Sequence, residues 1–248
     1  MSAAGPERPD LLASLTGKVA VVTGGARGQG AAEAELLVAL GAHVLITDVI
    51  ADEGAALAER LGERAAFVTH DVSSRAAWDR VAEVARERHG RVDVLVNNAG
   101  VYRTGDILTW PEDDLRRLLE INLLGAVFGL QALVPLMPEG SAVVNVASIS
   151  GMRGHGGALP YAASKWGLRG ATRSAARELA PRGIRVNCVC PGAVETPMIA
   201  GSTMDLSHLP IPRRGTAQEV AGLVAYLASD AAAYVTGAEF VVDGGSTA

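Results

Sequence analysis

The regular alternation of short β-branched runs with longer Ala- and Leu-rich runs is the feature that most constrains this fold. Strands that alternate with helices form a parallel sheet with helices on both faces, and right-handed crossovers wind it in both directions. The pattern therefore predicts an α/β fold on a doubly wound, seven-stranded parallel sheet, with ligands beyond the carboxyl ends of the strands. The expected strands are residues 18–25, 42–48, 65–71, 92–100, 141–148, 184–190 and 238–245, and the expected helices are 28–40, 52–61, 74–89, 111–137, 161–180 and 217–228.

Length and composition are consistent with one packed domain. The chain has 248 residues, of which 49% are hydrophobic and 20% charged, so we expect a single domain at residues 17–248 after a flexible N-terminal leader at 1–16. The formal charge is −5 without a basic tract, which argues against nucleic-acid and polybasic membrane partners. No apolar run approaches the roughly 20 residues that span a bilayer, and the polar N-terminus is unlike a signal peptide, so we expect a cytoplasmic protein.

The cysteines and histidines predict neither a disulfide nor a metal site. Cys188 and Cys190 are two residues apart on an expected strand. Side chains at that spacing lie about 6–7 Å apart along the strand, so both are expected to be reduced core thiols. The five histidines show no metal-ligand spacing, and we therefore expect no metal.

A glycine-rich turn, "TGGARGQG", joins the first expected strand to the first helix. Glycine permits a tight turn and a close approach of backbone to phosphate, and the N-terminus of the following helix favours an anion. Asp48, which ends the second strand, can accept hydrogen bonds from the ribose hydroxyls of a dinucleotide and would repel a 2′-phosphate. This predicts NAD rather than NADP; the alternative is that Asp48 is only an acid at the start of the next helix.

Tyr161 and Lys165 are expected on one face of a helix because they are four residues apart. Ser148 ends the fifth strand thirteen residues before Tyr161. Its hydroxyl could hydrogen-bond a substrate oxygen with which the phenol exchanges a proton. The ordinary pKa of tyrosine, near 10, is too high for a base at neutral pH, but the Lys165 ammonium and a nicotinium charge would lower it. The alternatives are a packing tyrosine and a solvated lysine.

These motifs, with "NNAG" at 97–100 and "PGAVET" at 191–196, resemble the single-domain branch of the short-chain dehydrogenase/reductase family. The glycine turn matches the family pattern TGxxxGxG, and the tyrosine and lysine match YxxxK. The resemblance extends over about residues 17–245 and implies a Rossmann-type fold. Within the family, the run "YAASKWGLRG" and the ending "YVTGAEFVVDGG" are most similar to bacterial 3α/20β-hydroxysteroid dehydrogenases and related secondary-alcohol dehydrogenases.

The resemblance implies a role for each matching position. Tyr161 would be the acid/base, Lys165 would modulate its pKa and bind the nicotinamide ribose, and Asn122 would hold a relay water through its backbone carbonyl. Arg27 lies where NADP-preferring relatives have a basic residue that meets the 2′-phosphate, which opposes the NAD prediction from Asp48. The implied cofactor contacts are Gly24, Arg27, Gly28, Gln29, Gly30, Asp48, Val49, Asp71, Val72, Asn98, Ala99, Gly100, Tyr161, Lys165, Pro191, Gly192, Val194 and Thr196.

Substrate contacts are expected at the mouth of the cleft. Residues 198–214 show no clear periodicity and are expected to form a substrate lid. His155, in the glycine-rich loop before the helix, is expected to face substrate; the alternative is a solvent-facing histidine. Gln29 departs from the apolar residue that the family usually has near the cofactor. The expected substrate contacts are Ser148, His155, Tyr161, Ala193 and Met198.

The resemblance implies an NAD(H)-dependent oxidoreductase that acts on CH–OH groups and interconverts a secondary alcohol and a ketone. A hydroxysteroid or another lipophilic carbonyl compound is the candidate small-molecule substrate. The alternatives are an NADP(H)-dependent ketone or 3-oxoacyl reductase and a non-catalytic nucleotide-binding protein of the same fold. The family also implies a homotetramer in which helices 111–137 and 161–180 pair between subunits.

Overall fold

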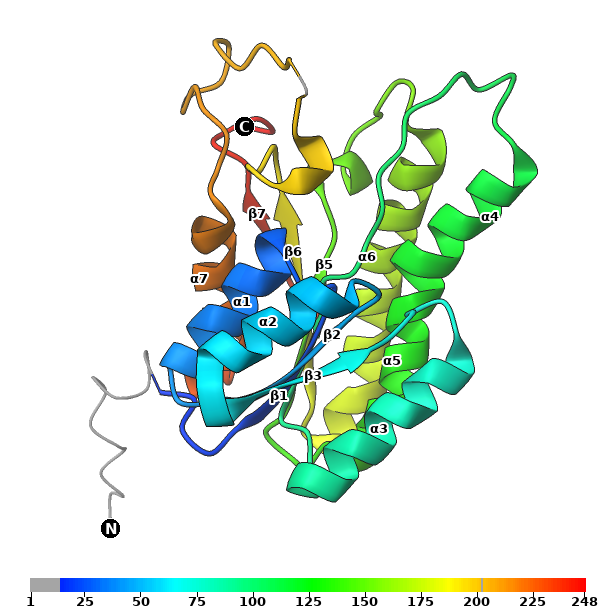
Figure 1. Cartoon of the computed structure of the whole chain (residues 1–248). Helices are drawn as coiled ribbons and strands as arrows, with labels where there is room; N and C mark the ends of the chain where they lie inside the picture. The colour runs from blue at the N-terminus through cyan, green and yellow to red at the C-terminus, as the bar shows by residue number, and fades with distance from the viewer. Residues whose placement is uncertain (1–13, 202) are drawn as a thin grey trace.

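The computed structural model describes residues 14–201 and 203–248. Residues 1–13 of the predicted leader lie outside the described residues. Seven strands in the described part of the chain are β1 (Val19–Thr23), β2 (His43–Asp48), β3 (Ala65–Thr69), β4 (Val94–Asn97), β5 (Ala142–Val146), β6 (Arg185–Pro191) and β7 (Glu239–Val242). They form one parallel sheet in the order β3-β2-β1-β4-β5-β6-β7 (Figure 1). The strand order reverses between β1 and β4, which places a crevice at their carboxyl ends.

Helices cover both faces of the sheet (Figure 1). One layer holds α1 (Gly28–Ala39), α2 (Ala51–Leu61) and α7 (Ala217–Ala228). The other layer holds α3 (Arg75–His89), α4 (Glu112–Leu119), α5 (Gly125–Leu133) and α6 (Leu159–Leu179). This is the Rossmann-type, doubly wound α/β fold that the alternation of elements predicts, and the fold prediction is confirmed.

Each face of the sheet has its own hydrophobic core. Along β1, Val22 packs into the cluster under α1 and α7, whereas Val21 packs into the cluster under α3 and α5. Successive side chains of a strand point to opposite faces, so a strand covered on both sides is mainly apolar. All five residues of β1 and of β5 are buried, which explains why these strands are mainly apolar runs rich in valine rather than alternating ones.

The helix predicted at residues 111–137 is present but interrupted. Pro111 is the cap before α4 rather than the first helical residue, and a π-turn at Glu120–Leu124 separates α4 from α5. A 3₁₀ turn at Val134–Leu136 ends it. A π-turn inserts one residue into the ordinary helical hydrogen-bond ladder, and such turns are frequent at functional sites. The insertion falls at Asn122, a predicted site residue.

One helical stretch of the described residues, Glu112–Leu136, is long and apolar enough to cross a bilayer by length and composition. The most apolar 18-residue window of this stretch has a mean hydropathy of 1.6, and half of that window is buried within the fold. The same stretch packs against the sheet and against α3 and α6. Core helices of globular proteins pass the same test, so the stretch is weak support for a membrane span.

The two cysteines lie on β6 and are both free. Both are fully buried, and their Sγ atoms are 3.9 Å apart. Within residues 14–201 and 203–248, no group of three or more His, Cys, Asp or Glu side chains is placed to hold a metal ion.

Candidate active site

Gly24, Gly28 and Gly30 shape the turn between β1 and α1. Gly24 and Gly28 have φ angles of 62° and 60°, which L side chains rarely adopt. A Cβ atom on Gly30 would lie 2.2 Å from the carbonyl oxygen of Gly24, and one on Gly24 would lie 2.8 Å from the Cα of Ala99. The turn therefore packs directly on the loop after β4. Its bare backbone at the N-terminus of α1 suits a phosphate group.

Asp48 ends β2, and its carboxylate accepts hydrogen bonds from the backbone N–H groups of Ala26 at 3.0 Å and Ile50 at 3.1 Å. It thus ties the glycine-rich turn to β2, and each oxygen keeps a lone pair for a ribose hydroxyl. Arg27 is half exposed, with Nη1 3.9 Å from a carboxylate oxygen of Glu53. Glu53 therefore reduces the positive potential that a 2′-phosphate would meet at Arg27.

Three predicted cofactor contacts, Val49, Asp71 and Val72, lie just beyond β2 and β3. Val49 is 61% exposed, a large apolar side chain available to a planar ring. Asp71 Oδ1 accepts hydrogen bonds from the hydroxyl of Ser73 at 2.6 Å and from its backbone N–H at 2.9 Å, and these bonds lower the pKa of Asp71. Val72 is buried in the core against Gly125, so a cofactor contact there would fall to its backbone.

Asn98 and Ala99 join the loop after β4 to the glycine-rich turn. Asn98 Nδ2 donates to the carbonyl oxygens of Thr23 at 2.9 Å and Gly24 at 3.1 Å. The Thr23 hydroxyl accepts hydrogen bonds from the backbone N–H groups of Asn98 and Ala99, both at 3.1 Å. These bonds fix two predicted cofactor segments relative to each other, across the crevice at the switch of strand order.

The loop after β6 lies on the other side of this crevice. Gly192 packs closely on Asp243, because a Cβ at Gly192 would lie 2.9 Å from the Cα of Asp243. Val194 is buried in the core. Thr196 lies beside the first turn, since a Cβ at Gly28 would lie 3.5 Å from the Cβ of Thr196. The glycine-rich turn and the loop after β6, both predicted to contact cofactor, therefore lie side by side.

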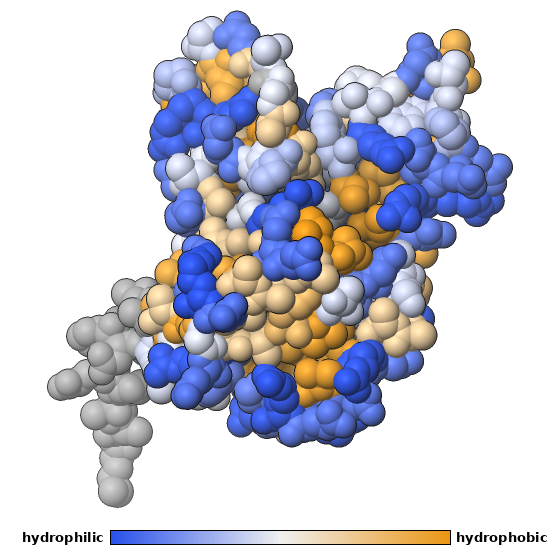
Figure 2. Space-filling model, viewed as in Figure 1, coloured by the Kyte–Doolittle hydropathy of each residue, from blue (hydrophilic) through white to orange (hydrophobic). Residues whose placement is uncertain are grey.

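A cleft of about 910 Å³ opens between these segments at the carboxyl ends of the strands. It lies beneath the hollow at the top of Figure 2, between the predicted lid and the chain that precedes α4. Residue 202 of that lid lies outside the described residues. The predicted residues that line the cleft are Gln29, Ser148, His155, Tyr161, Pro191, Gly192, Ala193, Val194, Thr196 and Met198. The predicted residues outside its walls are Gly24, Arg27, Gly28, Gly30, Asp48, Val49, Asp71, Val72, Asn98, Ala99, Gly100, Asn122 and Lys165.

Ser148 and Tyr161 face this cleft together. Ser148 follows β5, and its Oγ accepts a hydrogen bond from the backbone N–H of Ser150 at 3.1 Å. Burial raises the pKa of Tyr161, and a hydrogen bond with the Ser148 side chain partly offsets that rise. The lowering of the Tyr161 pKa expected from Lys165 is therefore not found, and burial, which disfavours a phenolate, is the largest effect. A cationic nicotinium ring would have to supply the missing stabilisation.

Lys165 lies one helical turn after Tyr161, behind the wall of the cleft. Its Nζ is 5.8 Å from the centre of the Tyr161 ring and donates a 2.8 Å hydrogen bond to the carbonyl oxygen of Val146. The side chain is buried, and burial lowers the pKa of Lys165 to about 8. An ammonium with that pKa exchanges protons readily near neutral pH.

Asn122 is buried in the π-turn beside Lys165. Its Oδ1 accepts a hydrogen bond from the backbone N–H of Val101 at 2.8 Å, and its Nδ2 donates to the hydroxyl of Ser164 at 3.1 Å. A Cβ on Gly100 would lie 3.3 Å from Asn122 Oδ1 and 3.5 Å from Lys165 Nζ. The four predicted catalytic residues are thus gathered by β5, α6, the π-turn and the loop after β4.

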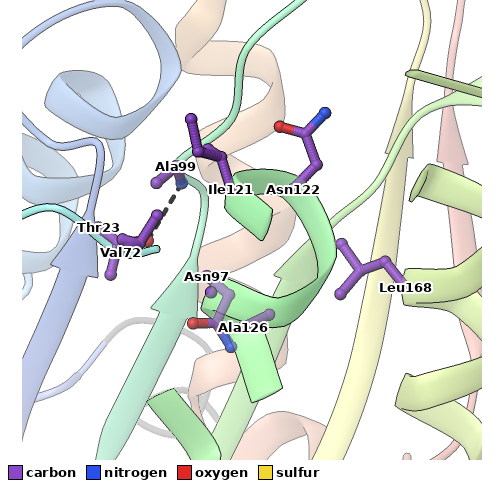
Figure 3. A pocket seen from close by; sticks show the side chains of 9 residues that line it. Thr23, Val72, Asn97, Ala99, Ile121, Asn122, Ala126 and Leu168 are labelled. Carbon is purple, nitrogen blue, oxygen red and sulfur yellow. Dashed lines mark hydrogen bonds between the residues drawn. The ribbon is translucent and has the colours of Figure 1, made fainter. Parts of the chain in front are cut away.

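A small pocket of about 10 Å³ lies beside Asn122 (Figure 3). A space of this size holds roughly one water molecule, provided that polar groups line it. Asn97 Oδ1, which is buried, has no hydrogen-bond partner in the described part of the chain. The cavity places a water-sized space next to the residue predicted to hold a relay water. Its walls are Thr23, Val72, Asn97, Ala99, Ile121, Asn122, Gly125, Ala126 and Leu168.

Tyr102 is a cleft residue that the motifs do not reveal. Its ring packs edge-on against that of Tyr161, with centroids 5.0 Å apart, and stacks on His155 at 5.8 Å. His155, predicted to face substrate, lines the cleft and has its Nδ1 2.8 Å from the hydroxyl of Ser150. The only sequence signal was a tyrosine two residues after "NNAG", in a chain with four tyrosines.

Glu33 is a second residue that the motifs do not reveal. It lies on α1 four residues after Gln29, and neither of its oxygens has a hydrogen-bond partner among the described residues. Burial raises the pKa of Glu33 to about 8, so the carboxyl group is protonated at neutral pH. Gln29 lines the cleft with its Oε1 buried and also without a partner in the described ranges.

Comparisons with known proteins show the family to which the chain belongs. Residues 24–247 match a family model described as enoyl-(acyl carrier protein) reductase. The chain belongs to the short-chain dehydrogenase/reductase family of oxidoreductases, and the resemblance inferred from its motifs is confirmed.

Curated relatives share nearly the whole chain. It is 42% identical over 241 residues to trans-4-hydroxycyclohexanecarboxylate dehydrogenase of Sinomonas cyclohexanicum, covering 93% of each chain. It is 43% identical over 236 residues to 3-alpha-(or 20-beta)-hydroxysteroid dehydrogenase of Mycobacterium tuberculosis, covering 94% of this chain and 91% of the relative. It is 40% identical to 3-oxoacyl-[acyl-carrier-protein] reductase of Escherichia coli, covering 94% and 98%.

Solved structures show the same fold. A short-chain dehydrogenase/reductase from Brucella melitensis superimposes with a TM-score of 0.90 at 36% identity, covering 93% of this chain and 96% of the other. A blue fluorescent protein from a metagenomic library, solved with NADPH, gives a TM-score of 0.91 at 40% identity, covering 95% and 100%.

Proposed function

We propose that this protein is an NAD(H)-dependent oxidoreductase that interconverts a secondary alcohol and a ketone. The observation that carries the proposal is the pair of Ser148 and Tyr161, which face one cleft with Lys165 and Asn122 directly behind them. A hydroxyl and a phenol on one wall can share a single substrate oxygen. That arrangement suits the transfer of a proton to or from an alcohol.

The chain's own residues provide binding, orientation and proton transfer. A nicotinamide dinucleotide, when bound, exchanges a hydride with the substrate carbon. Ser148 donates a hydrogen bond to the substrate oxygen, and Tyr161 transfers the proton at the same oxygen. Lys165, with its pKa of about 8, holds a proton one helical turn away. Asn122 fixes the π-turn and the loop after β4 on either side of this lysine.

The glycine-rich turn and its neighbours suit a dinucleotide. Gly24, Gly28 and Gly30 let the turn fold tightly against itself, the loop after β4 and Thr196. The backbone N–H groups at the N-terminus of α1, which this turn leads into, suit a phosphate. We propose NAD because Asp48, at the end of β2, accepts only one hydrogen bond at each oxygen and can accept more from ribose hydroxyls, and because Glu53 lies near Arg27.

The second candidate is an NADP(H)-dependent ketone or 3-oxoacyl reductase. Arg27 favours it, since its half-exposed guanidinium could turn from Glu53 to a 2′-phosphate at little cost. The structural neighbour solved with NADPH and the relative named 3-oxoacyl-[acyl-carrier-protein] reductase also favour it. A non-catalytic nucleotide-binding protein is disfavoured by the intact serine, tyrosine and lysine set.

For the substrate we propose a lipophilic cyclic alcohol or ketone such as a hydroxysteroid. The cleft is large, and its walls include the apolar side chains of Ile149, Met198, Leu206, Leu209 and Ile211. Apolar walls suit the ring system of such a compound, and polar groups such as Ser148 and Tyr161 fix its orientation. Two curated relatives are named for a hydroxysteroid and a hydroxycyclohexane substrate.

We further propose a cytoplasmic homotetramer in which residues 17–248 form one domain. Leu119, Leu124 and Trp166 are exposed on the helices predicted to pair between subunits, with Trp166 50% exposed. Exposed apolar side chains on adjacent helices are typical of an interface. Sedimentation that shows only monomers would contradict the tetramer.

A panel of alcohols and ketones tests the proposal. Steroidal, monocyclic, sugar and acyl substrates are supplied with NADH, NADPH or their oxidised forms, and the change in nicotinamide absorbance is followed. We expect turnover of lipophilic secondary alcohols or ketones with a higher kcat/KM for NADH. A higher value for NADPH would favour the second candidate, and dinucleotide binding without turnover of any compound would favour the non-catalytic protein.

A further inference from the structure

Arg169 lies on α6 one helical turn after Lys165 but does not line the cleft. The loop after β5 packs against α6 and β6, and it forms a short 3₁₀ turn at Ile149–Gly151 immediately after Ser148. The two terminal nitrogens of Arg169 contact this turn and β7, respectively.

The guanidinium of Arg169 joins three elements. Its Nη1 donates a hydrogen bond to the carbonyl oxygen of Gly151, and its Nη2 donates one to Glu239 Oε2 on β7 at 2.6 Å. The other carboxylate oxygen of Glu239 is 3.1 Å from Arg173 Nε. The Arg169 and Glu239 side chains are only 13% and 10% exposed, so this ion pair is screened far less than a surface pair. The Arg169 guanidinium also lies 4.8 Å from the centre of the Trp166 ring.

The turn that Arg169 holds also determines where Ser148 lies. The backbone N–H of Gly151 donates to the carbonyl oxygen of Ser148 at 2.9 Å, and the Ser148 Oγ accepts from the backbone N–H of Ser150 at 3.1 Å. Gly151 rests directly on α6, because a Cβ there would lie 2.8 Å from the carbonyl carbon of Lys165. A shift of the turn would therefore move Ser148 relative to the helix that carries Tyr161 and Lys165.

We infer that Arg169 is a positioning residue that clamps the 149–151 turn to α6 and β7 and thereby holds the Ser148 hydroxyl against Tyr161. The inference rests on the proposed oxidoreductase function. A planar guanidinium can donate to Gly151 and Glu239 in two directions at once, whereas a lysine ammonium is a point charge on a flexible stem. The clamp needs an arginine for this reason, and Lys should replace it poorly.

The test compares Arg169→Gln with Arg173→Gln, a control that removes the other arginine bound to Glu239 from an exposed position on the same helix. Arg169→Gln leaves the Glu239 carboxylate nearly buried with one partner fewer, which can destabilise the fold. The double variant R169Q/E239Q removes both charges and restores stability without restoring the clamp. Hydrogen exchange of residues 148–153, NADH affinity, kcat and the pH profile of alcohol oxidation are measured for all variants and for Arg169→Lys.

We expect Arg169→Gln and R169Q/E239Q to lower kcat by roughly tenfold to hundredfold, the loss that a small misplacement of a reacting group produces, with NADH affinity unchanged. Hydrogen exchange at 148–153 should rise in both and stay unchanged in Arg173→Gln. The Ser148 hydrogen bond lowers the pKa of Tyr161, so the profile for oxidation should move to higher pH in both variants. Ser148→Ala should move it in the same direction, and Arg169→Gln should add little to Ser148→Ala because both act on the same hydroxyl.

Each measurement can overturn the inference. Unchanged exchange at 148–153 in Arg169→Gln would show that the clamp does not hold the turn, and this result does not depend on any substrate. Wild-type kcat in R169Q/E239Q, full rescue by Arg169→Lys, or multiplicative losses with Ser148→Ala would show that Arg169 does not act through Ser148. If the wild-type protein turns over no compound of the substrate panel, the result counts against the proposed function instead. Hydrogen exchange at residues 148–153 then still tests whether Arg169 holds the turn.

Discussion

The ammonium of Lys165 donates a 2.8 Å hydrogen bond to the carbonyl oxygen of Val146, the last residue of β5. A buried cation is thus held by one backbone acceptor, and burial lowers the pKa of Lys165 to about 8. The buried ammonium of Lys165 therefore destabilises the folded protein. Such groups are common where a titrating side chain serves chemistry near neutral pH.

Replacing Lys165 with Met should change how stability depends on pH. The folded-state pKa of Lys165 is about 8 against an ordinary 10.5, so between these values the unfolded chain binds more protons than the folded one. The free energy of unfolding of the wild-type protein, minus that of Lys165→Met, should therefore rise with pH across this window, by at most about 1.4 kcal/mol per unit. Urea denaturation of both proteins measures it. A constant difference would mean that Lys165 titrates like an exposed lysine.

Replacing Glu33 with Gln should have the opposite effect at lower pH. The folded-state pKa of Glu33 is about 8 against an ordinary 4.5, so between these values the folded chain holds a proton that the unfolded chain has lost. The wild-type free energy of unfolding, minus that of Glu33→Gln, should fall with rising pH, by on the order of 1.4 kcal/mol per unit. Glu35→Gln, which replaces a glutamate of the same helix that is partly exposed and paired with Arg60, is the control. If Glu33→Gln behaves like the control, Glu33 is ionised in the folded protein.

The strands and the glycine-rich turn could be predicted because each is a local pattern. A strand covered on both faces is a short apolar run, and the turn after β1 is recognised by its glycines. The place of Ser148 followed from parallel pairing, which brings the carboxyl ends of the strands to one side of the molecule, and the pairing of Tyr161 with Lys165 followed from their spacing of four residues on a helix.

The π-turn at Asn122 could not be predicted, because "EINLLG" keeps helical periodicity and the extra residue is accommodated by the side-chain bonds of Asn122 to Val101 and Ser164. The contact of Tyr102 with Tyr161 depends on the path of a loop between distant elements. The path of this loop cannot be predicted from the spacing of residues in the sequence. The burial of Glu33 was also hidden, since a glutamate in an Ala-rich helix is ordinarily on the solvent side.

Cofactor choice should respond to the residues around Arg27. Glu53→Gln removes the acid beside Arg27 and should raise kcat/KM for NADPH by a few-fold, the scale of an exposed ion pair. Arg27→Gln should lower it by a similar factor, and both should leave NADH nearly unchanged. Asp48→Asn should lower kcat/KM for NADH by roughly tenfold or more, the scale of a hydrogen bond to a charged group. If kcat/KM for NADPH is the same in Glu53→Gln, Arg27→Gln and the wild type, Arg27 and Glu53 do not determine the choice of cofactor.

Tyr102 should matter through its ring more than through its hydroxyl. Tyr102→Phe keeps the edge-on contact with Tyr161 and loses only the 3.4 Å contact with His155, so kcat/KM for a lipophilic substrate should stay within a few-fold of wild type. Tyr102→Ala removes the ring that borders both the cleft and Tyr161, and should raise KM and lower kcat together. Equal losses in the two variants would assign the effect to the hydroxyl instead.

The assignment of Tyr161 as the acid/base is tested most directly by the Tyr161→Phe variant, with Tyr234→Phe, at a fully exposed position, as the control. On a substrate found active in the panel, kcat of Tyr161→Phe should fall by about 10²–10⁴-fold, the contribution of a positioned proton donor. NADH binding and thermal stability should remain close to wild type, because the ring and its packing are kept. Tyr234→Phe should be unchanged. Turnover of Tyr161→Phe near the wild-type rate, with the same substrate and cofactor, would contradict the account.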